Sequence, residues 1–204
     1  MTISILNYQM GNIQSVARQL ERLGATVKIM STASEVLEAE KIILPGVGHF
    51  GEAMAHLHDQ GLVEALNKAV LEKGVPILGI CLGMQLMCAY SEEGNVQGLG
   101  WFEARVTHFQ IEDKLRYKVP HTGWNTAQAV NNDPLFRELS AEQEFYFVHA
   151  YLVQSAPSNE IMSTTTYEKL FISGLSKGNI MGVQFHPEKS HASGTQLIRN
   201  FIAL

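Results

Sequence analysis

Residues 75–83 read Val-Pro-Ile-Leu-Gly-Ile-Cys-Leu-Gly and contain the pattern that decides the fold. The short apolar run at 75–80 is typical of a buried β-strand, and residues 82–90 predict a helix directly behind it. A buried strand that passes straight into a helix is the repeating unit of α/β proteins with a parallel sheet.

The same alternation extends along the first half of the chain. Runs at 3–6, 26–30 and 41–44 predict three more strands, and residues 12–23 and 62–71 predict amphipathic helices. After residue 94 closely spaced strands are expected at 103–109, 115–119, 145–153, 161–167, 171–175 and 180–185, followed by a helix at about 193–202. Such spacing favours antiparallel pairing at one side of the sheet.

No repeat, low-complexity tract or linker interrupts the sequence. We therefore expect one α/β domain over residues 1–204, with a mostly parallel central sheet, flanking helices and additional antiparallel strands.

Composition narrows the classes of function. The 204 residues include 15 Lys and Arg against 20 Asp and Glu, and a net charge of −5 disfavours binding to nucleic acid. Hydrophobic residues make up 46% of the chain and charged residues 17%, a balance that predicts a buried core. The sequence begins without a signal-peptide pattern, contains two cysteines and has no apolar run long enough for a bilayer, so we expect a cytoplasmic protein without a membrane partner.

Cys81 lies where the strand at 75–80 meets the next helix, with Gly79 and Gly83 two residues to either side. This is the pattern of a nucleophile elbow with Cys in place of Ser, and a helix N-terminus favours the reactive thiolate. The alternative is a buried Cys that acts as a small hydrophobe. Cys88 lies seven residues along the predicted helix, about 10 Å away, which is too far for a disulfide and predicts a packing role.

His186 and Glu188 follow the last strong strand, in the stretch Gln-Phe-His-Pro-Glu at 184–188. Pro187 favours an extended His186, and side chains two apart in an extended segment project to the same side. The carboxylate can then hold the imidazole, which together with Cys81 predicts a Cys–His–Glu relay. The alternative is a turn with a solvated Glu.

Residues 44–51, Leu-Pro-Gly-Val-Gly-His-Phe-Gly, include a G-x-G-x-x-G pattern after the third strand. A dinucleotide fingerprint belongs on the first strand, with an acidic residue about 20 positions later, and here that region is predicted helical. We instead expect an oxyanion-binding nest in which the N–H groups of Val47 or Gly48 act with that of Leu82.

A metal site is not expected. The chain has eight histidines, but the closest pair, His56 and His58, does not share a helix face, and no other metal-ligand spacing is present. The sequence therefore predicts neither a metal nor a cofactor.

Three stretches together resemble the class I, or triad, glutamine amidotransferases: Gly-Ile-Cys-Leu-Gly-Met-Gln-Leu-Met at 79–87, Leu-Pro-Gly-Val-Gly-His-Phe at 44–50 and His-Pro-Glu-Lys-Ser at 186–190. Their order and spacing agree over nearly the whole chain. Residues 7–16 and the stretch Val-Pro-His-Thr-Gly-Trp-Asn at 119–125 more narrowly resemble the glutaminase subunits of imidazole glycerol phosphate synthase, in histidine biosynthesis.

The resemblance implies a flavodoxin-like glutaminase fold and hydrolysis of L-glutamine to glutamate and ammonia through a cysteinyl thioester. It implies Cys81 as nucleophile, His186 as general base and acid, and Glu188 as orienting carboxylate. The implied substrate contacts are Gln85, Glu93, His149, Ala150 and Tyr151, with Glu93 on the α-amino group and backbone near Ala150 on the carboxylate.

The resemblance also implies a partner. Ammonia would pass to a cyclase subunit, a TIM barrel on another chain of a heterodimer, that makes imidazole glycerol phosphate and AICAR. The implied partner face comprises Asn12, Pro120, His121, Gly123, Trp124 and Asn125. Three positions depart from the family pattern: Asn7 stands in place of Asp, Gln9 in place of Gly, and Ala150 in place of Ser or Thr.

Three alternatives remain. A paralogous glutaminase that supplies a synthase aminating a surface-polysaccharide sugar would share all these motifs. A cysteine peptidase or chaperone-like protein on the same fold is disfavoured by Gln85 and the His-Pro-Glu segment, and an inactive binding subunit is disfavoured by the intact Cys81, His186 and Glu188.

Overall fold

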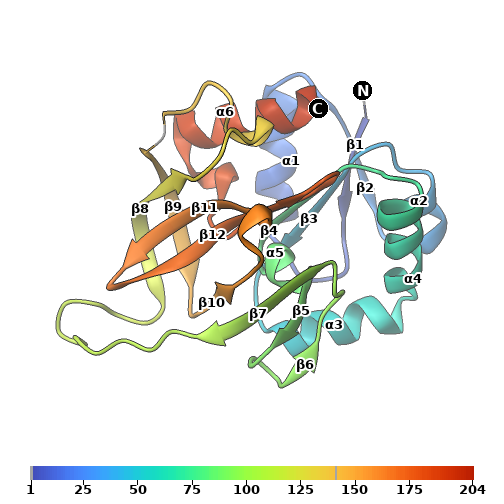
Figure 1. Cartoon of the computed structure of the whole chain (residues 1–204). Helices are drawn as coiled ribbons and strands as arrows, with labels where there is room; N and C mark the ends of the chain where they lie inside the picture. The colour runs from blue at the N-terminus through green and yellow to red at the C-terminus, as the bar shows by residue number, and fades with distance from the viewer. Residues whose placement is uncertain (1, 141) are drawn as a thin grey trace.

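Five parallel strands form the centre of the sheet, in the order β2-β1-β3-β4-β13 (Figure 1). The structure is a computed structural model that describes residues 2–140 and 142–204. The central strands are β1 (Thr2–Leu6), β2 (Thr26–Met30), β3 (Ile42–Gly46), β4 (Ile77–Cys81) and β13 (Ile180–Val183). β3 and β4 are buried along their whole length, which explains their continuous apolar sequences.

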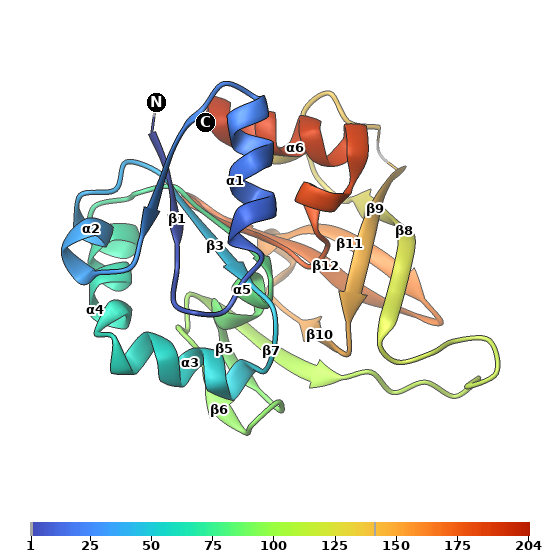
Figure 2. The same ribbon diagram turned by 180° about the vertical axis from the view of Figure 1, so that it is seen from behind.

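Helices cover both faces of this parallel centre. On one face α1 (Ile13–Arg22) and α6 (His191–Ala203) lie side by side, joined by a 2.6 Å hydrogen bond from Gln19 to Thr195 (Figure 2). The other face is covered by α2 (Ala33–Leu37), α3 (Phe50–Asp59) and α4 (Leu62–Asn67). A π-helical turn, Lys68–Glu72, extends α4 at its C-terminal end. The predicted helix at 62–71 is therefore confirmed.

The strand pattern explains the two-sided core. Along β3, Ile43 packs with α1 and α6, whereas Ile42 and Leu44 pack with the helices of the opposite face. Alternate side chains of a strand point to opposite faces, so one apolar run feeds two separate hydrophobic clusters.

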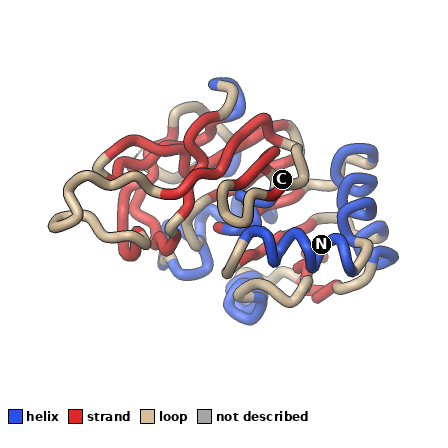
Figure 3. The backbone as a smooth tube through the Cα atoms, turned by 90° about the horizontal axis from the view of Figure 1, so that it is seen from below, coloured by secondary structure: helices blue, strands red, loops and turns tan. Residues whose placement is uncertain are grey.

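The sheet continues through antiparallel strands, as predicted. Beyond β13 lie β12 (Lys169–Lys177), β10 (Tyr151–Ser155), β7 (Phe102–His108), β5 (Cys88–Ser91) and β6 (Val96–Gln97). A second branch from β12 contains β11 (Ile161–Tyr167), β8 (His121–Ala129) and β9 (Glu142–His149). Figure 3 shows this strand-rich half beside the helical half.

Three predicted elements differ from the structure. The helix predicted at 82–90 ends at Leu86, because Cys88–Ser91 joins the sheet as β5 beside β7. The prediction for Cys88 therefore rested on the wrong element, although both cysteines are free and Cys88 is buried, as expected. The strand predicted at 145–153 is two strands, since β9 pairs with β8 whereas β10 pairs with β7 and β12.

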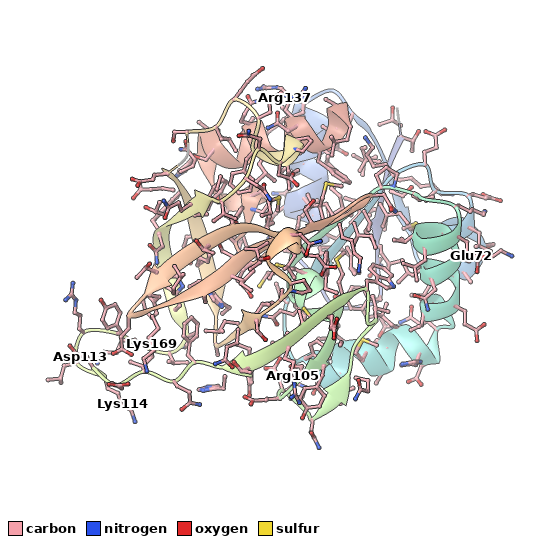
Figure 4. All side chains as sticks on the ribbon, in the orientation of Figure 1. Glu72, Arg105, Asp113, Lys114, Arg137 and Lys169 are labelled. Atoms are coloured by element: carbon pink, nitrogen blue, oxygen red, sulfur yellow. The ribbon has the colours of Figure 1, made fainter. Side chains whose placement is uncertain are left out.

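The strand predicted at 115–119 is instead part of a long loop between β7 and β8. Asp113 accepts backbone hydrogen bonds from the residues that follow it, which closes a turn, and Leu115 is 92% exposed. Figure 4 shows Asp113 and Lys114 at the outer end of this loop, while Lys169 lies nearer the sheet. Strand β8 begins only at His121.

Within the described part of the chain, every helix is too short or too polar to cross a membrane.

Candidate active site

Cys81 is the last residue of β4, and helix α5 (Leu82–Leu86) begins directly after it. Its φ of 55° and ψ of −113° turn the chain sharply. A Cβ atom at Gly83 would lie 1.8 Å from the carbonyl oxygen of Leu44, and one at Gly79 would lie 2.8 Å from that of Gly83. The two glycines thus allow α5 to approach β3 and β4 closely enough to form the predicted elbow.

His186 and Glu188 are joined by a 2.9 Å hydrogen bond from Nδ1 to Oε1, and both side chains are 1% exposed. His186 is extended, as its position before Pro187 requires, but Pro187–Lys189 is a 3₁₀ turn. The turn, and not a continued strand, therefore brings the carboxylate to the ring.

The other ring nitrogen of His186, Nε2, is available to the Cys81 side chain. Nε2 is buried, has no other partner among the described residues and interacts with the Cys81 side chain. Burial lowers the pKa of His186, but the charge and hydrogen bonds of Cys81 and Glu188 outweigh it and raise the pKa to about 10. The geometry therefore suits a protonated imidazole beside the Cys81 sulfur at neutral pH.

A cavity of about 290 Å³ opens above Cys81, near the lower end of the range for small-ligand pockets. Its walls bring together every substrate contact and oxyanion donor that the sequence proposed. The lining residues are Val47, Gly48, Cys81, Leu82, Gln85, Glu93, Pro120, Val148, His149, Ala150 and Tyr151.

The segment with the proposed oxyanion donors, Val47 and Gly48, is called the oxyanion segment and directly follows β3. Gly48 has a φ of +112°, a conformation that favours glycine, and Val47 is 40% exposed. The buried Tyr8 hydroxyl donates a 2.9 Å hydrogen bond to the carbonyl of Pro45. Tyr8, which was not among the expected site residues, therefore anchors the strand end that carries the proposed donors.

Gln85 and Gln184 form a buried amide pair beside the cavity. Gln85 Nε2 donates to the carbonyl of Tyr151 at 3.0 Å and to Gln184 Oε1 at 2.8 Å, and Gln184 Nε2 donates to Cys81 Sγ at 3.7 Å. Sequence reasoning missed Gln184. The available signal was its spacing: Gln184 lies two residues before His186, and side chains two apart in an extended segment project to the same side.

His149 and His121 form a buried pair behind the cavity wall. His149 Nδ1 lies 2.7 Å from the carbonyl of Tyr151, which can only accept, so Nδ1 carries the proton and Nε2 accepts from His121 Nδ1 at 3.1 Å. Asn125 Nδ2 then lies 3.3 Å from His121 Nε2. Burial lowers the pKa of His149 to about 3 and that of His121 to about 4, so both are neutral at pH 7.

The residues expected at a partner face differ in accessibility. His121 is only 2% exposed, so its side chain is unavailable to a partner, contrary to expectation, and Pro120 lines the cavity. Asn12 lies 3.5 Å from Glu188 Oε1, beside the triad. Trp124 is 45% exposed and stacks on His191 at a ring distance of 4.9 Å.

Over residues 2–140 and 142–204, no three His, Cys, Asp or Glu side chains gather in a geometry that would hold a metal ion.

A family model described as "Glutamine amidotransferase class-I" matches residues 4–204. The chain belongs to the class I glutamine amidotransferases. As an amidotransferase it is an enzyme, so the expected family and activity class are confirmed.

Curated relatives show a narrower group of amidotransferases to which this chain is similar. It is 43% identical to imidazole glycerol phosphate synthase subunit HisH 2 of Methanococcus maripaludis, over 98% of each chain. It is 42% identical to subunit HisH of Acinetobacter baylyi, over 98% of this chain and 97% of that one, and 39% identical to HisH 2 of Pseudomonas aeruginosa, over 99% of each. The narrower resemblance found in the sequence is thereby confirmed.

Solved structures agree on the fold. PurLQS from Thermotoga maritima has a TM-score of 0.77 at 17% identity, over 99% of this chain and 97% of that one. A structure described as a glutamine amidotransferase has a TM-score of 0.76 at 18% identity, over 98% and 97% of the chains. The amidotransferase has the expected α/β architecture.

Proposed function

We propose that the chain hydrolyses L-glutamine at Cys81 and delivers the ammonia to a cyclase subunit on a second chain, which makes imidazole glycerol phosphate and AICAR in histidine biosynthesis. The observation that carries the proposal is the position of Cys81, at a sharp strand-to-helix turn beneath a cavity and beside the buried pair of His186 and Glu188. The full-length similarity to HisH subunits supports the pathway.

The chemistry proceeds in two halves. The Cys81 thiolate attacks the side-chain amide carbon of glutamine, and N–H groups of Leu82 and of Val47 or Gly48 hold the oxyanion. His186 gives its proton to the departing nitrogen, so ammonia leaves and a thioester remains. His186 then takes a proton from water as the water attacks the thioester, and glutamate and the thiolate are released.

Substrate recognition follows from the charges of the cavity wall. Glu93 lines the cavity and one of its oxygens already accepts from Phe50 N at 2.8 Å, which fixes the carboxylate in place for the substrate's α-ammonium group. Both amide hydrogens of Gln85 are engaged, so this side chain offers the substrate only its oxygen. Backbone groups around Ala150 remain for the α-carboxylate.

A partner is needed for the product as well as for control. Ammonia released into water at neutral pH becomes ammonium, which is not a nucleophile, so the product is useful only if it reaches its acceptor directly. The exposed Trp124, the neighbouring Gly123 and Asn12 are the residues proposed to meet a TIM-barrel partner in a heterodimer.

The test is an assay of glutamate release by the purified chain alone, with a candidate cyclase subunit, and with that subunit and its acceptor substrate. We expect strong release only in the complete mixture, together with stoichiometric formation of the cyclase product. An absence of glutamate release in every mixture, with a folded chain and a demonstrated complex, would overturn the proposal.

A second candidate function concerns the acceptor. Several similar subunits carry the numbers 1 or 2 in their names. This observation favours keeping the alternative in which the same glutaminase supplies a synthase that aminates a surface-polysaccharide sugar. Purifying the chain with each candidate barrel distinguishes the two, because only the true partner forms a complex and stimulates the glutaminase.

A further inference from the structure

A continuous series of hydrogen bonds leads from the carbonyl of Tyr151 to the sulfur of Cys81. Gln85 donates to that carbonyl and to Gln184, and Gln184 donates to Cys81 Sγ at 3.7 Å. Gln85 is 4% exposed, Gln184 0% and Cys81 6%, so water does not compete effectively with these contacts.

The backbone carbonyl sets the direction of the whole series. Because a carbonyl oxygen can only accept, Gln85 must present its NH₂ group to Tyr151, and the second hydrogen of that group points at Gln184. Gln184 must then present its oxygen to Gln85. Its NH₂ group is left facing the sulfur.

We propose that Gln184 is a further catalytic residue, which stabilises the Cys81 thiolate through its side-chain N–H and is held in that orientation by Gln85. The proposal rests on the proposed function only in taking Cys81 as the nucleophile. A hydrogen bond to an ionised acceptor is stronger than one to a neutral acceptor, so the N–H favours thiolate over thiol.

The opposing contact at the sulfur shows why a donor is needed. The carbonyl oxygen of Val148 lies 3.8 Å from Sγ, where it can accept from a thiol but repels a thiolate. Gln184 supplies the compensating donor from β13's side of the site, in addition to the imidazole of His186.

Titratable groups face Cys81 from several elements, and the test must separate their effects from that of Gln184. Tyr8 follows β1 and interacts with the charge of Cys81, His186 follows β13 with Glu188 behind it, and His149, at the end of β9, interacts with His186. All remain in place when only Gln184 is changed.

The test is the rate of alkylation of Cys81 by iodoacetamide between pH 5 and 10, quantified on the Cys81 peptide by mass spectrometry. Gln184→Met keeps the length and loses the donor, and we expect the pH midpoint of alkylation to rise by about one to two units. Gln184→Glu should raise the midpoint further, because it places a like charge beside the thiolate.

Gln85→Met is the discriminating variant. It leaves the sulfur's neighbours unchanged but frees the Gln184 amide to rotate, so we expect a smaller shift in the same direction. Gln143→Met is the matched control, because its partly buried amide donates to Ser193 and not to this series, and its midpoint should match the parent chain.

An unchanged midpoint in folded Gln184→Met would overturn the inference, and if that variant does not fold, an unchanged midpoint in Gln85→Met would do so. Iodoacetamide reports on the thiolate without any glutamine. A normal shift in these variants with no glutaminase activity in the parent chain would therefore count against the proposed function and not against the role of Gln184.

Discussion

At the scale of single residues, each member of the triad has a distinct chemical role. Cys81 supplies the electron pair, His186 moves the protons, and Glu188 accepts the 2.9 Å hydrogen bond that keeps the ring in one tautomer. The imidazole is already favoured in its charged form by both neighbours. The loss of His186 and the loss of Glu188 should therefore reduce the rate to different extents.

We expect His186→Ala to abolish turnover and Glu188→Gln to retain a measurable rate. The amide of Gln cannot supply the charge but can still orient the ring, so kcat should fall by about 10² to 10⁴. Steady-state glutaminase kinetics with the activating partner present are the measurement. Near-normal rates in His186→Ala would remove His186 from the mechanism.

The two cysteines should differ completely in reactivity. Cys81 lines the cavity, whereas Cys88 is 0% exposed and burial raises the pKa of its thiol. An electrophilic glutamine analogue should label Cys81 alone, as judged by peptide mapping of the modified chain. An adduct found on Cys88 would contradict the assignment of the nucleophile.

At the scale of elements, the elbow depends on contact between α5 and β3. A methyl group at position 83 would lie 1.8 Å from the Leu44 carbonyl, so Gly83→Ala must push the helix away from the sheet. We expect a loss of about 1–3 kcal/mol in the free energy of unfolding, together with lost glutaminase activity. Urea denaturation and the activity assay measure the two effects.

Gly51→Ala is the matched control for that experiment. Position 51 lies in α3, and the nearest atom to an added Cβ is Cε1 of the His49 side chain at 3.2 Å, not a backbone atom. A helical Ala in place of Gly gains up to about 1 kcal/mol, part of which a small shift of the capping His49 side chain offsets, so we expect little net change in stability. Equal destabilisation by both substitutions would mean that the close approach at Gly83 is not special.

Elements with strong local patterns were predictable from sequence, and those fixed by distant partners were not. Residues 3–6 and 77–81 are apolar strands whichever neighbours they have, and both are present. Residues 88–91 follow a helical pattern but become β5 because β7 offers an edge. In the same way, β8 was missed because its polar sequence is stabilised by pairing with β9 along its length.

The residues of the site show the same difference between local patterns and distant contacts. Cys81, His186 and the Gly46–Gly48 region belong to compact motifs that the sequence displays. Tyr8 and Gln184 act through contacts with residues 37 and 103 positions away; the spacing of Gln184 from His186 indicates its side of the strand, but neither position shows its distant partner.

At the scale of the whole molecule, pH should affect stability through the buried histidines. The pKa values of His149, about 3, and His121, about 4, lie below the value near 6.5 of an unfolded histidine. Unfolding therefore takes up protons, so the stability they support is complete above about pH 6.5 and is lost as pH falls from there toward 4. The raised pKa of His186 acts oppositely, because its contribution is complete below about 6.5 and is lost toward pH 10.

We therefore expect the Tm to fall between pH 6.5 and 5, and to fall less steeply in His121→Phe. Phenylalanine retains the stacking of His121 on Phe147 and Tyr167 but cannot be protonated. Calorimetry across this range is the measurement. Identical slopes in the two proteins would show that His121 does not contribute to the acid sensitivity.

Coupling to a partner is the second property of the whole molecule. The oxyanion segment ends at the surface, with Val47 40% exposed and Gly48 at a glycine-favoured φ, so a docked subunit can bias its orientation. One oxyanion donor is worth about 10² to 10³ in rate, so partner and acceptor together should activate the chain by at least that factor. The measurement is kcat with and without both.

Trp124→Ala should weaken association or activation while Cys81 labelling stays normal. Leu71→Ala is the control, because Leu71 is 54% exposed and lies next to Glu72 in the sequence, on the opposite side of the molecule from the loop that carries Asp113 (Figure 4). A purified chain that is fully active and indifferent to any barrel subunit would refute the coupling.

The backbone at Cys81 implies a trade-off between activity and stability. A non-glycine residue at a φ of 55° and ψ of −113° stores about 1–3 kcal/mol of strain, more than the roughly 0.5–1 kcal/mol by which glycine's freedom destabilises a folded chain. Cys81→Gly should therefore be inactive and recover the backbone strain, while losing the buried side chain and its interaction with His186, whereas Cys81→Ser keeps the strain. The strained backbone at position 81 thus lowers the stability of the chain in exchange for a nucleophile that lines the cavity, and the inactive Gly variant is suitable material for trapping glutamine in an unreacted complex.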